Sequence, residues 1–502
     1  MNVRDPLSAL PAYDSPYIVN WEIERQYLKP RNAYTIHESL DTGYTVKSLA
    51  VHGGDTLFAY AVKSATTAKV YDVTTTASEV DALGTVLHSP AAVKHAGRTY
   101  FMLPTSRTPA TNSSYWDGST WNNWGFTESA SSVGGACGVS HKGRFYFADG
   151  TDLYFTALGQ VTGEVDGVFP LGDVLEEDED IVWMGVLASP TDRAAEAYLA
   201  LGNQAGEVLV YGGDFPESSN WELLARFKLP QLAVTGTTGD AIPTYVLQDL
   251  NDIWVPTKSG IFSIRKLFIH GSSSFEETTV SSKINPQLIG HLSTFTANNN
   301  ISFASLPEKG KVYVLIDGWY DLSGNYAITN NGVSTMYVYD RVTDAWTLHR
   351  IIADVNSNVV AFNGSVYFGC DNHILKYDEA DYLDEDIDNP SSTFEYDCHL
   401  YSSHTNFGSN YKYKHIKTLE PLLQTDFDGS TIKVQVVGDF GRDVSQESSR
   451  EVITSTSIAN GYSSPTYNVG AKGSYLQWRM TVTPTSNLKN RCNLFAVNMG
   501  VK

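Results

Sequence analysis

Carboxylate, imidazole and hydroxyl side chains are numerous in this chain of 502 residues, but they follow none of the common catalytic patterns. The sequence contains no GxxxxGKS/T phosphate loop, no HExxH zinc helix and no GxSxG nucleophile elbow. His52-Gly53-Gly54 is similar to the oxyanion turn of some esterases, but no serine elbow accompanies it, which favours a plain hairpin tip. We therefore predict that the protein is not an enzyme, and we assign no catalytic, cofactor-binding or metal-binding residue and no cofactor.

Two acidic clusters offer the carboxylate oxygens that calcium prefers, but not at the spacing of a calcium-binding loop. Asp173 precedes an acidic stretch at residues 176–180, and a second acidic run occupies residues 378–388. Calcium loops need oxygen ligands at set spacing around a turn glycine, as in DxDxDG. Both clusters lack that order, so solvated loops are predicted at both places.

The best single candidate for glycoside chemistry is Asp317-Gly318-Trp319-Tyr320-Asp321, which sets two carboxylates beside two rings that could stack on a sugar. Glycosidase carboxylates must lie roughly 5–10 Å apart in a cleft, and sequence does not define that distance. A long loop packed by its own aromatic rings is the favoured interpretation, and the glycosidase alternative stays open.

The charge of the chain argues against a surface that grips nucleic acid. There are 56 acidic and 35 basic residues, which leave a net charge of −21. A phosphate-binding surface needs the opposite sign. An acidic wall could instead line a conduit from which a passing duplex is repelled, and ordinary solubility is the other explanation.

The N-terminus and the cysteines predict a protein made and kept in the cytosol. Residues 1–6 lack the basic start and apolar core of a signal peptide, and no stretch approaches the ~20 apolar residues of a membrane span. The cysteines form no CxxC pair, so buried thiols are predicted in place of disulfides or zinc. They are Cys137, Cys370, Cys398 and Cys492.

A hairpin pattern recurs along most of the chain. Each copy has a β-rich run, a turn carrying Gly, Asp or Asn, and a second run of aromatic and β-branched residues. The turns are marked by Gly54, Gly97, Gly143, Gly202, Asn251, Gly310 and Gly364. A further strand is predicted after each hairpin, at residues 69–72, 115–118, 152–155, 206–211, 260–264, 336–340 and 374–378.

The spacing of these units predicts the fold. A four-stranded blade needs ~40–50 residues plus loops, and the turn markers recur at about that interval. Radial packing shelters edges that an open row of hairpins would expose. We predict an all-β protein with a β-propeller of about six to eight blades over residues 46–390.

Residues 115–121 and 339–346 resemble the outer-strand turns of kelch and Asp-box blades, in which an aspartate closes the turn and a tryptophan packs between blades. These signatures support the fold without selecting a function.

The segment before the propeller lacks the hairpin rhythm. Residues 1–45 are bounded internally by prolines and are rich in Tyr and Trp, and the best helical turn of the chain is predicted near Asn20–Leu28. We interpret this segment as an N-terminal docking arm. A strand that closes the propeller or packs on its side is the alternative.

A different pattern begins after the propeller. The acidic residues 378–390 are predicted to form a solvated linker. From Ser391 apolar and polar residues alternate, as they do in half-buried antiparallel strands. The clearest segments are 394–400, 414–420, 431–437 and 475–482. A C-terminal β-sandwich is therefore predicted over residues 391–502.

Three stretches together resemble a known family, the β-propeller tail proteins of short-tailed bacteriophages, called packaged-DNA stabilization or tail nozzle proteins. Thr257–Arg265 with Val280–Asn285 is similar to the end of a middle blade in such proteins, and Thr335–Trp346 to their blade ending. The third stretch resembles their exit from the propeller into a C-terminal sandwich. It comprises residues 369–378, 393–396, 412–417 and 432–436.

This resemblance implies a structural virion protein in the tail, assembled in the host cytoplasm as a homo-oligomer of about six copies below the portal and its adaptor ring. Such a ring, or nozzle, extends the DNA channel, retains the packaged genome and conducts it at ejection. Expected partners are the adaptor and portal, with tail fibres or spikes as further candidates. DNA is only passing cargo, and no membrane insertion is expected. The alternatives are a glycan-binding or glycan-hydrolysing propeller and a cellular scaffold of kelch type.

Overall fold

The computed structural model describes most of the chain between Ser15 and Val501. The described residues are 15–24, 27–64, 67–81, 91–102, 113–188, 196–233, 245–270, 275–292, 301–316, 319–320, 326–327, 333–378, 383–387, 393–394, 396–403, 414–425, 431–439, 443–444, 448–451, 462–463, 466–483 and 492–501.

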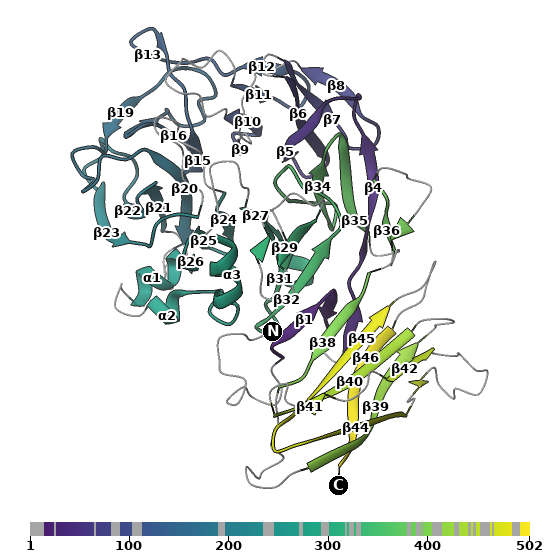
Figure 1. The fold of residues 1–502 in the computed structure, drawn as a ribbon. Coiled ribbons are helices and arrows are strands. Elements are labelled where there is room, and N and C mark those ends of the chain that lie inside the picture. Colours follow the sequence, from purple (N-terminus) through teal and green to yellow (C-terminus); the bar gives the residue numbers. More distant parts are fainter. Residues whose placement is uncertain are drawn as a thin grey trace.

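Seven antiparallel blade sheets follow one another along the described chain and form a ring (Figure 1). Five of them are separate four-stranded sheets, the fifth in order has three strands, and the sixth is a four-stranded part of a larger sheet. The first three consist of β5 (Thr45–His52), β6 (Thr56–Ser64), β7 (Thr67–Asp72) and β8 (Ser78–Asp81); β9 (Ala91–His95), β10 (Arg98–Met102), β11 (Ser114–Trp116) and β12 (Trp121–Asn123); and β15 (Cys137–His141), β16 (Arg144–Asp149), β17 (Asp152–Phe155) and β19 (Gly167–Pro170). The fourth and fifth consist of β20 (Ile181–Ala188), β21 (Ala197–Asn203), β22 (Glu207–Gly212) and β23 (Glu222–Lys228); and β24 (Leu247–Asp249), β25 (Asp252–Thr257) and β26 (Gly260–Ser263). The last two consist of β27 (Ile301–Leu306), β28 (Lys311–Ile316), β31 (Ser334–Asp340) and β32 (Ala345–Ile351); and β33 (Val360–Phe362), β34 (Ser365–Cys370), β35 (His373–Asp378) and β4 (Ala33–Ser39).

The ring is closed by contacts between the inner strands. They run from β5 through β9, β15, β20, the β24–β25 hairpin, β27 and β33 back to β5. This mainly-β arrangement of four-stranded antiparallel sheets is consistent with a seven-bladed β-propeller.

Local turn chemistry explains why the hairpins form where the sequence predicts them. In the β9–β10 turn both Ala96 and Gly97 have positive φ, at 48° and 74°, and Lys142 and Gly143 repeat this at 47° and 75° between β15 and β16. Positive φ at both central residues is the type I′ geometry that matches strand twist. One marker was misplaced, because Gly202 lies inside β21 and the turn falls instead at Gly206, with φ of 88°.

The N-terminal segment is built into the sheets. β4 pairs with β35 as the outer strand of the seventh sheet. This part of the segment therefore forms the propeller-closing strand that the sequence analysis gave as the alternative to a docking arm. The helical turn predicted near Asn20–Leu28 is wrong. This stretch forms β2 (Trp21–Ile23) and β3 (Leu28–Pro30), because these two strands pair with each other and β3 also pairs with β46 (Cys492–Val501).

Helices occur where the sequence predicted only the end of a blade. α1 (Ile264–His270), α2 (Phe275–Thr278) and α3 (Asn285–Leu292) follow β26, and a 3-10 turn, η1 (Pro307–Lys309), joins β27 to β28. Between α2 and α3 the chain takes the place of a fourth strand. Val280 N–H donates to Ile261 O at 2.9 Å, and Ile261 N–H donates to Ser281 Oγ at 2.9 Å.

The sixth sheet continues into the C-terminal part without a break. β1 (Tyr17–Val19) pairs with β32 on one side and β38 (Cys398–Tyr401) on the other. Beyond β38 lie β45 (Leu476–Thr483) and β40 (Thr431–Gly438), with β41 (Asp443–Val444) and β42 (Ser448–Glu451) on β40. The described sheet has ten strands.

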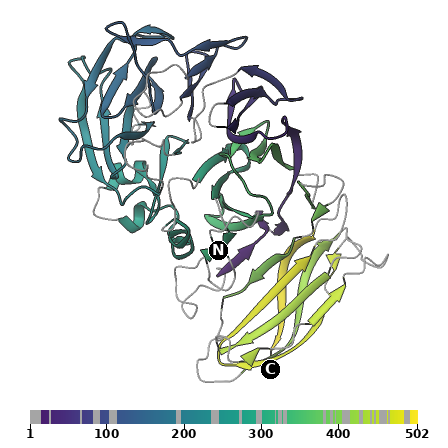
Figure 2. The same cartoon turned by 45° about the horizontal axis from the view of Figure 1, so that its top comes forward.

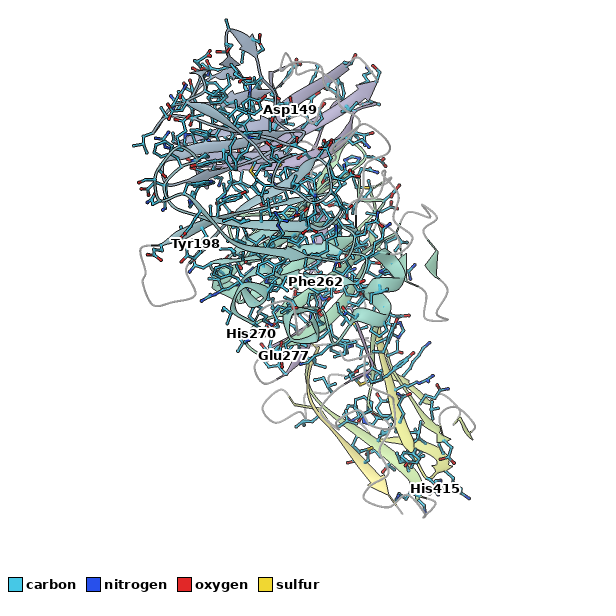
Figure 3. All side chains as sticks on the ribbon, turned by 90° about the vertical axis from the view of Figure 1, so that its left-hand side faces the viewer. Asp149, Tyr198, Phe262, His270, Glu277 and His415 are labelled. Carbon is cyan, nitrogen blue, oxygen red and sulfur yellow. The ribbon has the colours of Figure 1, made fainter. Side chains whose placement is uncertain are left out.

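A second C-terminal sheet contains β2, β3, β46, β39 (Lys414–Thr425), β43 (Tyr462–Ser463) and β44 (Tyr467–Gly473). Leu419 of β39 and Val434 of β40 belong to one hydrophobic cluster, so the two sheets share buried side chains. Figure 2 shows these strands beside the ring, next to β1. In Figure 3 Asp149 and His415 mark opposite ends of the molecule.

Short pairings complete the described fold. They are β13 (Phe126–Glu128) with β14 (Ser131–Ser132) and β18 (Gly163–Glu164), β29 (Trp319–Tyr320) with β30 (Tyr326–Ala327), and β36 (Asp384–Glu385) with β37 (Thr393–Phe394).

Candidate functional site

A cavity of about 310 Å³ lies among the inner strands of the second to fifth sheets. Lys94 of β9, Ser140 of β15, Met184 of β20 and Gln248 of β24 border it. Partial burial lowers the pKa of Lys94, because an ammonium loses hydration there. The described lining contains this one cation and no carboxylate, so it offers groups that bind a small polar molecule but no carboxylate acid–base pair.

His52 ties two blades together at the hairpin tip that the sequence compared with an oxyanion turn. Its Nδ1 lies 2.9 Å from Thr99 Oγ1 in the next sheet. His95, at the equivalent place one blade on, has Nδ1 2.9 Å from Ser140 Oγ and Nε2 3.1 Å from Gln160 O. A serine next to a histidine could suggest a nucleophile, but repetition of the contact with a threonine in the neighbouring blade favours an inter-blade tie.

The third histidine in this series differs. His141 ends β15 as His95 ends β9 and is equally buried, but neither of its ring nitrogens has a hydrogen-bond partner among the described residues. Burial lowers its pKa to about 4, so the ring is neutral at physiological pH.

Glu176 and Glu177 of the first acidic cluster neutralise cations on the outer strand of the fourth sheet. Glu176 Oε1 lies 3.0 Å from Arg226 Nη1, and Glu177 Oε1 lies 2.6 Å from Lys228 Nζ. Within the described part of the chain, no group of three or more His, Cys, Asp or Glu side chains could hold a metal ion. These contacts give the first acidic cluster a role in surface ion pairing.

The second acidic run is not wholly a solvated linker, and that prediction is wrong at Asp384. Asp384 and Arg31 are both fully buried, and Arg31 Nη1 donates to Asp384 Oδ1 at 2.7 Å while Nη2 donates to Oδ2. Burial raises the pKa of Asp384, and the Arg31 charge opposes that rise. The ion pair fixes the residues before β4 to the chain that leaves the propeller.

A second buried network joins the N-terminal segment to the sixth sheet. Glu22 Oε2 lies 3.1 Å from both Lys311 Nζ and Lys29 Nζ. Burial alone would raise the pKa of Glu22, but the two ammonium groups outweigh it and lower that pKa to about 2. Sequence reasoning missed both networks, since the partners are 289 and 353 residues apart and no local pattern marks them.

The aspartate turns form as predicted. Asp117 Oδ1 accepts the backbone N–H groups of Ser119 and Thr120, each at 2.8 Å, and Asp340 Oδ1 accepts that of Thr343 at 2.8 Å. Trp121 also packs against Phe58 of the preceding blade, with ring centroids 5.3 Å apart. Both signatures therefore have structural roles.

Some candidates are placed only in part. The side chains of Asp317–Asp321 lie outside the described residues, so the glycosidase interpretation is not tested. Cys137, Cys370 and Cys398 are buried free thiols, as predicted, while the side chain of Cys492 is outside the described set. No helix among the described residues is long and apolar enough to cross a membrane.

No protein-family model matches the chain, and no curated protein matches it significantly in sequence. Among solved structures, it is similar to Raptor from Chaetomium thermophilum, at 11% identity and a TM-score of 0.42, over 69% of this chain and 29% of that one. YCF48 from Cyanidioschyzon merolae matches at 11% identity and a TM-score of 0.38, over 69% and 98% of the two chains. The computationally designed Ika8 protein matches at 11% identity and a TM-score of 0.35, over 68% and 99%. Similarity at this level says nothing about activity or partners.

Proposed function

We propose that this protein is a structural component of a short bacteriophage tail, in which copies form a ring below the portal and adaptor. The ring extends the DNA channel, retains the packaged genome and conducts it at ejection. In this proposal the C-terminal residues 391–502 form a β-sandwich, the protein is not an enzyme, and DNA passes without being gripped.

The observation that carries the proposal is the unbroken sheet between propeller and C-terminal part. β1 joins β32 at the Val19–Leu348 position and pairs with β38 over three residues, and the buried Arg31–Asp384 pair adds a second link that resists hinge motion. A wall segment of a tube needs such fixed geometry between its parts. Supporting this, the sequence resembles tail nozzle proteins, and a net charge of −21 suits a path along which DNA slides.

Localisation on particles tests the proposal directly. Antibodies raised against the purified protein and coupled to gold should label the tail of phage particles whose genome encodes this chain, just below the capsid. Particles that package DNA but carry no label, with the protein confined to the lysate, would refute a virion role. An unrelated cytosolic protein of the same host serves as the control for background labelling.

A second test separates the structural function from the glycan alternative. Purified protein incubated with a panel of host polysaccharides should release no reducing ends. Release that persists after a further purification step would contradict the structural proposal and favour a glycan-hydrolysing propeller.

A further inference from the structure

The inner strands of four blades each leave one edge without a strand partner. β9, β15, β20 and β24 are the end strands of their sheets, and no described strand pairs with the edge that faces the ring axis (Figure 1). These four strands border the cavity of about 310 Å³. Backbone N–H and C=O groups on such an edge need water or a ligand as their partner.

The hydrogen bonds of β16 show which residues of β15 turn these groups toward the cavity. Phe145 N–H donates to Thr156 Oγ1 at 3.0 Å, and Phe145 O accepts Thr156 N–H at 3.1 Å, so both of its backbone groups face β17. Phe145 is therefore not hydrogen-bonded to Ser140, the residue opposite it in β15. Because the register is regular, the backbone groups of Ser140 and Gly138 face the cavity that both residues line.

The neighbouring strands add groups of the same kind. Val186 N–H donates to Gln248 Oε1 at 3.2 Å instead of to β21, and alternation gives Met184 the same orientation. In the β9–β10 hairpin the two-residue turn Ala96-Gly97 makes the adjoining pair a hydrogen-bonded one, so the backbone of Lys94, one position further, is turned away from β10. Met184, Gln248 and Lys94 all line the cavity.

The cavity therefore presents donors and acceptors in balance. Each inward-facing residue contributes one N–H and one C=O, and Gln248 Nε2 is a further donor without a partner in the described part of the chain. A carboxylate or phosphate would meet as many carbonyl oxygens as amides. Hydroxyl groups both donate and accept, so several hydroxyls on one small ring match such an array.

Size and lining limit the ligand further. Small-molecule pockets span roughly 300–1,000 Å³, so this cavity is large enough for one sugar ring but not for a chain of them. Val93, Val139 and Val246 supply apolar surface for the C–H groups of such a ring. The described lining has no carboxylate that could cleave a glycosidic bond.

We propose that this cavity binds an uncharged monosaccharide through the inward-facing backbone groups of β9, β15, β20 and β24, without cleaving it. This binding function goes beyond the proposed tail function and does not depend on it. Labelling of particles and sugar binding by the purified chain can therefore succeed or fail separately.

Ligand-observed NMR on the full chain tests the ligand class. Among the methyl glycosides of glucose, galactose, mannose and N-acetylglucosamine, at least one should bind with a Kd on the order of 1 mM and should remain uncleaved. Tetrahydropyran, the same ring without hydroxyls, should not bind. The methyl glycoside of glucuronic acid should bind no more tightly than that of glucose, because the array does not favour an anion.

Two variants test the place of binding, each with a matched control. Ala92 is exposed and lines the cavity, so Ala92→Phe should fill part of it and weaken the Kd at least roughly tenfold, whereas Ala96→Phe in the turn of the same hairpin should not change it. Gln248→Glu keeps an oxygen for Val186 N–H but replaces the free amide donor, and should weaken the Kd about fivefold. Gln231→Glu makes the same change at an exposed position outside the cavity and should have no effect.

Circular dichroism should show that the variants keep their fold, and Gln248→Glu keeps the test valid if Ala92→Phe does not. The proposal is overturned if no glycoside binds at roughly 20 mM, or if both cavity variants bind as well as the unmodified protein. A glucuronide that binds more tightly than the glucoside, and loses that advantage in Lys94→Met, would show an anion site instead.

Discussion

Replacing Arg31 with methionine should strongly destabilise the protein. The Arg31 side chain is fully buried, donates to Asp384 through both Nη atoms, donates to Asn20 Oδ1 at 3.2 Å, and lies 3.9 Å from the centre of the Tyr396 ring. Methionine fills much of the same volume but leaves the Asp384 carboxylate buried without a cation. Removing one partner of a buried ion pair costs about 3–5 kcal/mol, so we expect a loss of that size in the free energy of unfolding near neutral pH.

The pH dependence of this loss should identify its cause. Without Arg31 nothing opposes the effect of burial, so the pKa of Asp384 in the folded variant rises further above its value in the unfolded chain. A carboxyl with a raised folded pKa stabilises the fold only while it is protonated, and this stability is lost as pH rises through the folded pKa. The destabilisation should therefore be smaller at about pH 5 than at about pH 8.

Urea unfolding followed by tryptophan fluorescence measures these losses, and hydrogen exchange locates them. Exchange should accelerate first in β4, which follows Arg31, and in β36, which contains Asp384. Arg31→Met/Asp384→Leu removes both charges, and since apolar replacement of a buried pair is often neutral, it should recover most of the stability. A loss below about 1 kcal/mol in the single variant, or a double variant as unstable as the sum of the singles, would refute this reasoning.

Three further predictions concern other parts of the chain. Folding lowers the pKa of Glu22 from 4.5 to about 2, so its stabilising contribution is present above pH 4.5 and is lost as pH falls toward 2. Glu22→Gln should therefore weaken the decline of the unfolding free energy with falling pH, as measured by urea unfolding at a series of pH values. Gly202→Ala should destabilise the fold by about 1–3 kcal/mol in thermal unfolding, since a Cβ there would lie 2.4 Å from the Trp183 ring; an unchanged melting temperature would contradict the close packing. The purified protein should not bind duplex DNA at physiological ionic strength, and micromolar binding with a steep salt dependence in a gel-shift assay would argue against passive conduction.

The candidate site could be predicted from sequence only where its chemistry is local. Asp117 and Asp340 close their turns by accepting N–H groups two and three residues ahead, so the pattern alone was sufficient. The inter-blade contacts of His52 and His95 were not foreseen, although the two histidines precede similar turns, because their hydroxyl partners are 47 and 45 residues away.

The sequence by itself determined the repeating hairpins of this protein. Alternation of side chains and turns such as Ala96-Gly97 act within a few residues, and they appear where the pattern predicts strands and turns. Only the tertiary structure decided how the ring closes, why β2 and β3 are strands, where α1 to α3 replace an outer strand, and that Arg31 meets Asp384 across 353 residues. The reason is physical: a turn depends on backbone dihedral angles that nearby residues set, whereas a pairing partner or a buried counter-charge exists only once distant segments have packed together.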